Sequence, residues 1–408
     1  MATDNKNKVL NVPHLRFQEF DGEWDKHHLS EYLDFKNGLN PNAKRIGHGL
    51  PFISVMDILA DGVIDYDSIR GKVEATEKEI ECFGVQNGDL LFQRSSETLE
   101  DVGRANVYMD SRTAIYGGFV IRGRKIGNYD PLFFKYLLAT PLARKRTCRM
   151  GAGAQHFNIG QEGLSKISLF FPSLEEQTKI ATLLRLIDEL IATQNKIIED
   201  LKELKSAIID YAFTNNKNVE REQILLSDIS TKITRKNTDN RISNVLSNSA
   251  NQGVVPQSGV FDREIANEEN ISNYIVISYN DFVYNPRKSA IAPYGPINKY
   301  NGELKGVISP LYLCFRTHDI NAEYLAWYFK SRLWHEYIYK NGDAGVRHDR
   351  VSIKDDVFFS MPLNIHSKLE QGRIANKLNK IESFVMQEIQ YLSLLQTQKN
   401  FLLQQMFI

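Results

Sequence analysis

The chain has 408 residues, of which 42% are hydrophobic and 25% are charged, and its formal net charge is zero. This composition is typical of an ordinary globular protein with two or three domains, and the three scattered cysteines, which form no CxxC pair, argue against a disulfide framework or a zinc site. The chain has neither 18 consecutive uncharged apolar residues nor an apolar N-terminal stretch, so we expect no membrane span and no signal peptide, and a cytoplasmic location fits the cysteine usage.

The first 172 residues are expected to fold as a mixed α/β domain. A turn that contains Asp89 leads into a short apolar strand, which ends at Arg94. The elements expected in chain order are strands at 90–94 and 119–122, an aromatic-rich helix at 131–147, a glycine-rich loop at 151–158 and a strand at 167–171. Short strands separated by Gly, Asn and Asp turns, together with one helix, are typical of an α+β domain.

A long helix is predicted for residues 173–215, with Ser173 as its N-cap. One line of residues recurs every seven positions: Ile180, Ile187, Gln194, Leu201 and Ile208. A second line follows three positions further on, at Leu183, Leu190, Ile197, Leu204 and Tyr211, and a third widens the stripe at Leu184, Ile191, Ile198, Lys205 and Ala212. This recurrence over five heptads predicts a coiled coil.

The helix has a second copy near the end of the chain. Glu176-Gln177-x-x-Ile180 matches Glu370-Gln371-x-x-Ile374 at an offset of 194 residues (370 − 176 = 194), which persists to the matched pair Phe213 and Phe407. A second helix is therefore predicted for 364–408. Its two seam lines are Ile374, Ile381, Glu388, Leu395 and Leu402, and Leu378, Val385, Leu392 and Met406.

Each seam carries one polar residue near its middle, Gln194 in the first helix and Glu388 in the second. If the helices pack antiparallel, these two residues would meet close to a pseudo-dyad and could fix the register of the pair. The alternative interpretation is that one polar residue in five heptads is simply tolerated.

A second globular domain is expected at 216–363, between the two helices. It repeats the skeleton of the first domain: a turn and strand at 279–287, a strand at 311–316, a helix at 322–339, a glycine-rich loop at 342–350 and a strand at 357–361. The predicted fold class is therefore α+β, with two globular mixed α/β domains separated by two long helices that form an antiparallel coiled coil with pseudo-two-fold symmetry. Because the skeletons match and the surface residues differ, we expect the two domains to recognise two different features at a set distance.

The sequence offers little for catalysis. It contains no P-loop, no His-Glu-x-x-His motif and no Asn-Pro-Pro-aromatic methyltransferase signature. Glu203-Leu204-Lys205 has the form of a nuclease motif but lies on the predicted coiled-coil helix, without a strand beside it. His27, His28 and His48 have no partner at ligand spacing and are interpreted as surface histidines.

Several residues are candidates for nucleic-acid binding. Arg144, Lys145, Arg146 and Arg149 form a basic helix end that could neutralise phosphates, although cations are also favoured there by the helix dipole. The glycine-rich loops carry Gln155, His156 and Asn158 in one half, and Arg347, His348 and Arg350 in the other. Arg94, Arg287 and Lys288 stand at matched strand ends. Gln, Asn and Arg can read base edges with two hydrogen bonds, but each loop could also be a simple surface turn.

The helix entry Pro172-Ser-Leu-Glu-Glu-Gln-Thr-Lys-Ile180 resembles the repeated helical region of type I restriction-modification specificity subunits, as do residues 186–191, residues 201–205 and the terminal Phe213. The strand at 88–92 with the nearby Arg94 is similar to an element of their target recognition domains. The resemblance covers the chain in the order domain, helix, domain, helix. The second helix entry departs from the pattern, because extra residues separate Pro362 from Glu370.

The resemblance implies a non-catalytic subunit in which each target recognition domain reads one half of a bipartite DNA site. It further implies that the helices set the spacing and dock two adenine methyltransferase subunits, with two ATP-dependent restriction subunits in the full complex. S-adenosylmethionine and Mg-ATP are then expected on those partners, and no cofactor or metal on this chain. Two alternatives remain open: a coiled-coil adaptor whose globular halves bind protein, and a stand-alone DNA nuclease or methyltransferase.

Overall fold

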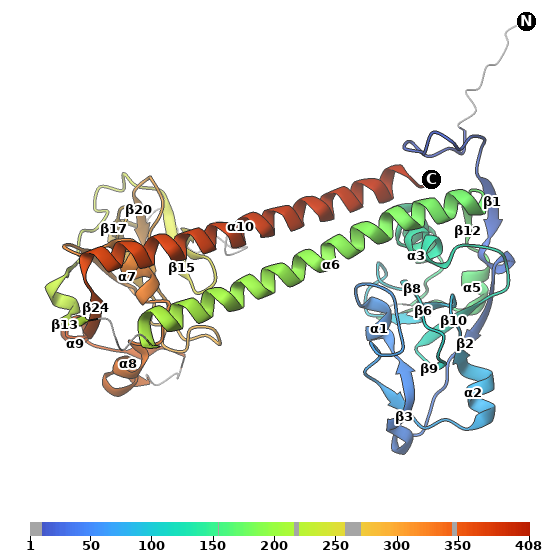
Figure 1. Cartoon of the computed structure of the whole chain (residues 1–408), viewed down its shortest axis with the longest axis horizontal. Helices are drawn as coiled ribbons and strands as arrows, with labels where there is room; N and C mark the ends of the chain where they lie inside the picture. Colours follow the sequence, from blue (N-terminus) through green and yellow to red (C-terminus); the bar gives the residue numbers. More distant parts are fainter. Residues whose placement is uncertain (1–9, 154, 216–219, 258–270, 345–348) are drawn as a thin grey trace, which may run out of the picture. The chain divides into compact units, whose positions relative to one another are not determined.

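The computed structural model describes residues 10–153, 155–215, 220–257, 271–344 and 349–408 (Figure 1). The chain forms two compact units. Unit 1 comprises the chain up to Lys196 together with Gln390–Ile408, and unit 2 comprises Ile197–Ile389. Each unit holds one globular α+β domain and one part of each of the two long helices, α6 (Leu174–Asp210) and α10 (Lys368–Gln405).

The globular domain of unit 1 is built from two four-stranded sheets and two short ribbons. The sheets have the strand orders β2-β10-β6-β8 and β4-β3-β9-β5, and the ribbons are β1-β12 and β11-β7. The strands are β1 (Asp25–His28), β2 (Leu33–Asn37), β3 (Ile46–Ile53), β4 (Lys72–Val73), β5 (Gly84–Val85), β6 (Leu90–Gln93), β7 (Ser95–Ser96), β8 (Ala105–Val107), β9 (Ala114–Tyr116), β10 (Val120–Lys125), β11 (Phe157–Asn158) and β12 (Ser168–Phe171). The helices are α1 (Val55–Leu59), α2 (Glu77–Phe83), α3 (Pro131–Ala139), α4 (Pro141–Cys148) and α5 (Gln161–Ser165).

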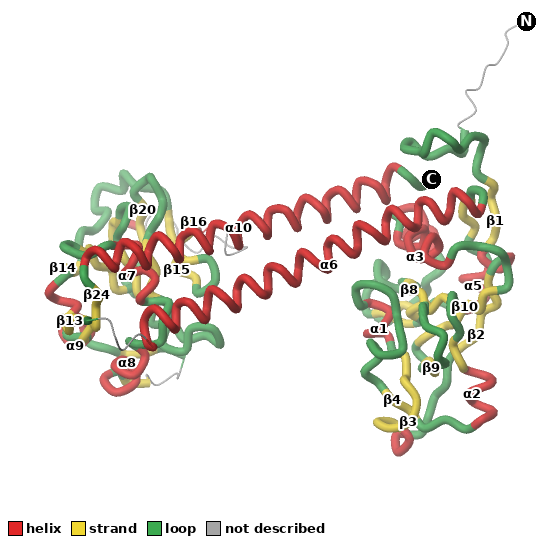
Figure 2. Tube along the Cα trace, viewed as in Figure 1, coloured by secondary structure: helices red, strands yellow, loops and turns green. Residues whose placement is uncertain are grey.

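The domain of unit 2 repeats this plan in its strand orders. Its strands are drawn in yellow in Figure 2. Its sheets have the orders β14-β21-β18-β19 and β16-β15-β20-β17, and its ribbons are β13-β24 and β22-β23. The strands are β13 (Arg221–Leu225), β14 (Ser230–Lys232), β15 (Val245–Ser249), β16 (Gly253–Pro256), β17 (Ile275–Ile277), β18 (Phe282–Tyr284), β19 (Ile297–Lys299), β20 (Gly306–Ile308), β21 (Leu313–Thr317), β22 (Asp343–Ala344), β23 (Val351–Ser352) and β24 (Pro362–His366). The helices are α7 (Ala322–Tyr328), α8 (His335–Asn341) and α9 (Asp355–Phe359).

Strand β6 is buried along its whole length because it separates two hydrophobic cores. Leu90 and Phe92 face the core that includes α3 and the start of α6, whereas Leu91 faces the core formed with β5 and β9. Successive side chains of a strand point to opposite faces, so a strand buried on both faces reads as a continuous apolar run. This is why the strand could be recognised in the sequence without an alternating pattern.

A buried aspartate and an arginine of the adjacent strand recur in both domains. Asp281 is bound by two nitrogens of Arg316 at 2.7 and 2.8 Å, and 192 positions earlier (281 − 89 = 192) Asp89 lies 3.5 Å from Arg124. Burial raises the pKa of Asp89, and the hydrogen bonds to Asp281 raise the pKa of Arg316. The domains therefore align at an offset of 192 residues over this region.

Each aromatic-rich helix is divided in two, which differs from the prediction of continuous helices at 131–147 and 322–339. In unit 1, Pro141 starts α4 and Thr140 caps it, because proline lacks the N–H that would continue the preceding helix. In unit 2, Trp334 lies buried between α7 and α8 and donates its indole N–H to the carbonyl of Phe329. The buried Trp334 side chain thus lies at the point where the predicted helix is interrupted.

The strand predicted at 357–361 is wrong: residues 357–359 belong to α9, and the strand is β24, which pairs with β13. Residues 364–366, which we expected to begin the second helix, also belong to β24, and α10 starts at Lys368. The residue that matches Pro172 is therefore His366 (366 − 172 = 194), because their carbonyls accept the side chains of Gln177 and Gln371, and Pro362 instead lies at the start of the strand.

The Glu-Gln motif joins each domain to its long helix. The side chain of Gln177 is buried, accepts the N–H of Asp130 at 3.1 Å and donates to the carbonyl of Pro172 at 3.0 Å. Gln371 makes the matching bonds to Asn321 and His366, at 3.1 and 2.9 Å. Because buried polar groups must be hydrogen-bonded, the glutamine is required where the helix begins.

The two long helices run antiparallel in each unit. In unit 1, Ile180, Leu184 and Ile187 of α6 share a core with Leu402 and Met406, near the end of α10. In unit 2, the last turns of α6 contribute to a core with Ala375 and Leu378, in the first turns of α10, and Phe213 follows directly after α6 in the same core. The predicted antiparallel helix pair is thus present in both units.

Ion pairs between the helices repeat at the 194-residue offset. In unit 1, Lys399 lies 2.6 Å from Asp188, which also accepts the hydroxyl of Tyr136. In unit 2, Lys205 lies 2.5 Å from Glu382. Lys205 and its 194-residue counterpart Lys399 therefore provide one cross-helix ion pair in each unit.

One of the three residue lines that the sequence predicts to be buried on α6 is largely exposed. The residues four positions after the first seam line, Leu184 and Ile198, are buried, whereas Leu190, Ile197 and Leu204 of the predicted second line are exposed. Of the first line, Ile180, Ile187 and Gln194 are buried, and Leu201 and Ile208 are half-buried. In the second helix, Leu378, Val385 and Met406 are buried and Leu392 of the same line is half-buried, and the line of Ile374, Ile381, Glu388, Leu395 and Leu402 is buried or half-buried. The meeting of Gln194 and Glu388 remains a prediction.

Candidate nucleic-acid interface

A pocket of about 290 Å³ lies in unit 2 where four chain segments meet. The segments are the end of β15, the loop after β18, the turn before β21 and the start of β23. Its lining residues include Ser247, Asn248, Asn285, Arg287, Lys288, Tyr312 and Arg350. The residues that line this pocket include three cations and no carboxylate, which makes it a suitable place for an anionic ligand.

The structure brings together three predicted residues from two segments that are far apart in the sequence. Arg287 and Arg350 are bridge partners, and the N–H of Lys288 donates to the carbonyl of Asp349 at 2.8 Å. Arg287 and Arg350 are exposed, while Lys288 is half-buried. Two arginines on adjacent backbone segments can present their guanidinium groups to phosphates or to guanine edges.

An asparagine network supports these cations. Asn248 is buried, donates to the carbonyl of Val283 at 2.7 Å and accepts from Asn298 at 2.6 Å. Asn285 donates to the carbonyl of Asn248 at 2.9 Å, and its side-chain oxygen accepts the N–H of Arg287 at 3.0 Å. Sequence reasoning missed Asn248, whose position follows only from the pairing of β15 with the rest of its sheet.

The two residues of unit 1 that match Arg287 and Arg350 have uncharged side chains. The bridge of Arg287 with Arg350 corresponds, 192 positions earlier, to the pairing of Ser95 with Asn158. The hydroxyl of Ser95 donates to the Asn158 side chain at 2.5 Å, and that side chain donates to the carbonyl of His156. The counterpart of Arg94 is Pro286, because the carbonyls of both accept the matched N–H groups of Ile159 and Val351. The predicted equivalence of Arg94 and Arg287 is therefore shifted by one residue.

The remaining predicted residues of unit 1 divide into two groups. Gln155, His156, Lys145 and Arg149 are exposed. Arg144 instead donates to the carbonyls of Glu100 and Val102, Arg146 donates to the carbonyl of Ser168 and lies over the ring of Phe170, and burial lowers the pKa of both arginines. These two guanidinium groups are thus engaged with backbone carbonyls of their own domain, and their phosphate contacts remain a prediction. Arg347 and His348 lie outside the described residues.

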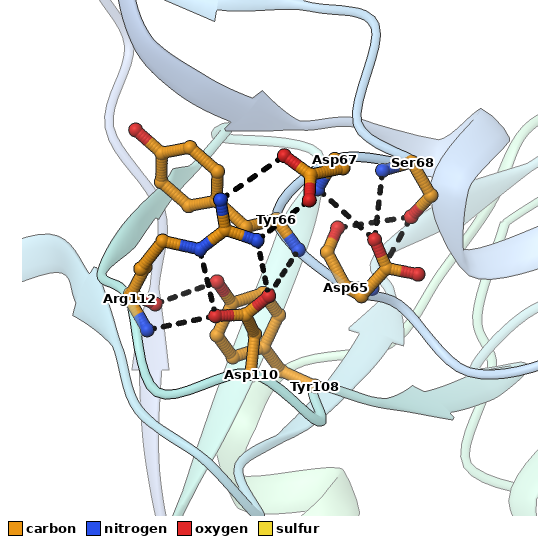
Figure 3. Close-up of polar contacts among 7 residues, drawn as sticks. All are labelled: Asp65, Tyr66, Asp67, Ser68, Tyr108, Asp110 and Arg112. Atoms are coloured by element: carbon orange, nitrogen blue, oxygen red, sulfur yellow. Dashed lines mark hydrogen bonds and ion pairs between the residues drawn. The ribbon is translucent and has the colours of Figure 1, made fainter.

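The sequence reading also missed a polar cluster in unit 1 (Figure 3). The guanidinium group of Arg112 bonds to Asp67 and Asp110 and lies 4.2 Å from the ring centre of Tyr66. In the turn that contains Tyr66, the side chain of Asp65 accepts the N–H groups of Asp67 and Ser68. The cluster ties the loop after α1 to the loop between β8 and β9. Hydrogen bonds to Arg112 lower the pKa of both Asp67 and Asp110, and they raise the pKa of Arg112.

This cluster predicts an acid-sensitive contribution to the stability of unit 1. An aspartate whose folded pKa lies below its unfolded value of about 3.9 stabilises the fold above that value, and the contribution is lost as the pH falls through the folded pKa. We therefore expect Arg112→Ala to lower the unfolding free energy at pH 7, and the difference from wild type to shrink below about pH 4. Chemical denaturation at a series of pH values measures this. A difference that does not change between pH 7 and pH 3 would contradict it.

Among the residues that the structure describes, no group of three or more His, Cys, Asp and Glu side chains could hold a metal ion. None of the helices in this described part of the chain is both long and apolar enough to cross a membrane.

Comparison with known proteins finds a family model and relatives that match about half of the chain or less. Residues 22–203 match the family model described as the type I restriction modification DNA specificity domain. The chain is 26% identical over 213 residues to the type I restriction enzyme MjaX specificity subunit of Methanocaldococcus jannaschii, covering 51% of this chain and 49% of that protein. It is 27% identical over 168 residues to the EcoKI specificity subunit of Escherichia coli, covering 40% of this chain and 35% of that protein. The matches thus span half or less of these relatives.

The fold itself has a solved counterpart along nearly the whole chain. The crystal structure of the type I restriction-modification system S subunit from M. genitalium superimposes with a TM-score of 0.56 and 13% identity, covering 97% of this chain and 99% of that one. Residues 22–203 thus match a type I restriction modification DNA specificity domain, and the chain shares the fold of that S subunit along nearly its whole length.

Proposed function

We propose that this protein is the DNA sequence-specificity subunit of a type I restriction-modification complex, and that each globular domain reads one half of a bipartite DNA target. The proposal rests on one pair of facing residues on adjacent backbone segments, which occupies the same place in both domains but has different side chains in each. Ser95 and Asn158 occupy this place in unit 1, and Arg287 and Arg350 occupy it in unit 2. A common skeleton with different hydrogen-bonding groups suits two different half-sites, because the side chains at such an edge decide which bases are preferred.

The test is selection of bound duplexes from a random DNA pool by the full chain, followed by binding at several salt concentrations. A specificity subunit is expected to enrich a motif of two separated half-sites, with an affinity that falls linearly on a log–log salt plot. A coiled-coil adaptor with protein-binding halves would enrich no motif. Methyl transfer or DNA cleavage by the purified chain alone would instead favour the stand-alone enzyme.

We propose further that the chain contributes no catalysis and that S-adenosylmethionine and Mg-ATP are bound by its partner subunits. The proposed partners are two adenine methyltransferase subunits and two ATP-dependent restriction subunits. Exposed apolar residues on the two long helices support a docking role. Leu190 and Ile197 of α6 have as their 194-residue counterparts Phe384 and Tyr391 of α10, and all four are exposed.

Arginine at one of these positions is expected to disrupt docking. Leu190→Arg or Phe384→Arg places a charge in an apolar interface, which costs several kcal/mol if the site becomes buried, so we expect loss of one bound methyltransferase subunit. Co-expression followed by mass measurement of the complex gives the subunit ratio. Glu189→Arg, at a neighbouring exposed position of α6, serves as the control and should keep both subunits. A full complement of subunits with both arginine variants would remove these residues from the interface.

A further inference from the structure

A large apolar side chain stands at the tip of a turn in each domain. Phe119 is 69% exposed and Leu311 is 62% exposed, and neither belongs to the hydrophobic cores described above. Single exposed apolar residues are ordinary on protein surfaces and need no explanation. These two, however, occupy the same place in both domains.

The turns that carry them are equivalent in backbone structure. The N–H of Val120 donates to the carbonyl of Gly117 at 2.9 Å, and the N–H of Tyr312 donates to the carbonyl of Ser309 at 3.1 Å. Each turn leads directly into the strand that holds the arginine partner of the buried aspartate, β10 in unit 1 and β21 in unit 2. The separation is again 192 positions (311 − 119 = 192), although the residue types along the two turns differ.

Both turns adjoin the polar edge of their domain. The carbonyl of Phe119 accepts the N–H of Arg94 at 2.9 Å, and the residue after Arg94 is Ser95, which bonds to Asn158. Leu311 lines the pocket that also contains Arg287, Lys288 and Arg350. An apolar side chain therefore projects beside hydrogen-bonding groups at the same edge of each domain.

We infer that Phe119 and Leu311 contact DNA bases directly and help to determine the sequence that each domain selects. The inference rests on the proposed function. Apolar side chains read thymine through its C5 methyl group in the major groove, and they can also enter between base pairs as wedges. An aromatic ring in one domain and a branched aliphatic chain in the other fit the reading of two different half-sites.

The experiment uses the full chain and duplexes carrying the motif that the wild-type chain selects. Phe119→Ala is expected to weaken binding on the order of 10- to 100-fold on duplexes with one intact half-site, and Leu311→Ala on duplexes with the other, as loss of a specific base contact does. The slope of the log–log salt plot should stay the same, because an apolar residue neutralises no phosphate. Replacing each thymine in turn by deoxyuridine then locates a contacted methyl group, since the matching Ala variant should be insensitive to that replacement.

Two further variants keep the test sharp. Ile126→Ala changes a residue that is 61% exposed at the opposite end of β10, and it should leave binding unchanged. Phe119→Leu places the residue type of unit 2 into unit 1 and is expected to change the preferred bases of one half-site more than the overall affinity.

The outcomes separate the two proposals. A wild-type chain that selects no motif would overturn the proposed function before any variant is compared. A wild-type chain that selects a motif, together with Phe119→Ala and Leu311→Ala variants that bind it equally well, would overturn only the present inference. Equal weakening on every DNA sequence with a shallower salt slope would also overturn it, because that result indicates an altered phosphate contact.

Discussion

Phe213→Ala is expected to lower the unfolding free energy of unit 2 by about 3–5 kcal/mol, the usual range for removal of a buried phenylalanine ring. Phe213 is fully buried and follows directly after α6. Its ring centre lies 5.4 Å from that of Tyr324 and 5.6 Å from that of Tyr328, and the same core includes Leu378 of α10. One side chain thus joins the end of the first long helix, the helix α7 and the second long helix.

Hydrogen exchange resolves this effect by unit. We expect the amides of β18 and β21 to lose protection in the Phe213→Ala variant, because they belong to the sheet of the affected unit. Tyr211→Ala, two residues earlier and 60% exposed, should change stability by less than about 0.5 kcal/mol. Unchanged protection in β18 and β21 would show that the core of unit 2 does not depend on the helix end.

Arg287→Ala and Arg350→Ala are expected to alter recognition of one DNA half-site and to leave the other as it is. If each guanidinium group makes a bidentate contact to guanine, its loss should cost about 1–3 kcal/mol of discrimination at one base pair. If it contacts phosphate, binding should weaken on all sequences and the slope of the log–log salt plot should become shallower by about 0.9.

The matched control for this experiment is Arg241→Ala. Arg241 is an exposed arginine of the same unit, it pairs with Asp239, and it does not line the pocket. Selection of bound duplexes with each variant gives the half-site preference, and titration at several salt concentrations gives the slope. Variants of Arg287 and Arg350 that match wild type in both measurements would place the DNA contact of unit 2 elsewhere.

Part of the candidate site could be found from sequence because each of its residues stands beside a local signal, although the segments that carry them are far apart in the chain. Arg287, Lys288 and Arg350 were singled out from a strand end and a glycine-rich loop, and the structure places them around one pocket. Arg144 and Arg146 were singled out by the same reasoning from charge, but they bond to backbone carbonyls. A run of basic residues does not indicate which side chains face solvent, since that depends on the segments that pack against the helix.

The equivalence of the two domains was also found only approximately. Arg94 and Arg287 both follow an apolar strand, yet the backbone bonds of Ile159 and Val351 show that Arg94 corresponds to Pro286. Because successive side chains of a strand point to opposite faces, a shift of one residue places a side chain on the opposite face of the sheet. Such a register can be read only from the pairing with a neighbouring strand.

The long helices show the division between sequence and tertiary structure most directly. The seven-residue recurrence and the Glu-Gln entry, repeated at an offset of 194 residues, determined by themselves that the chain has two long helices, each preceded by a globular domain. They could not determine which apolar line of α6 meets α10, because Leu183, Leu190, Ile197 and Leu204 are as apolar as Leu184, Ile191 and Ile198. Lines three and four positions after the first seam are both compatible with a coiled coil. The choice was made by the packing of α6 against α10 and the globular domains, which buries the line of Leu184 and leaves the line of Leu190 exposed.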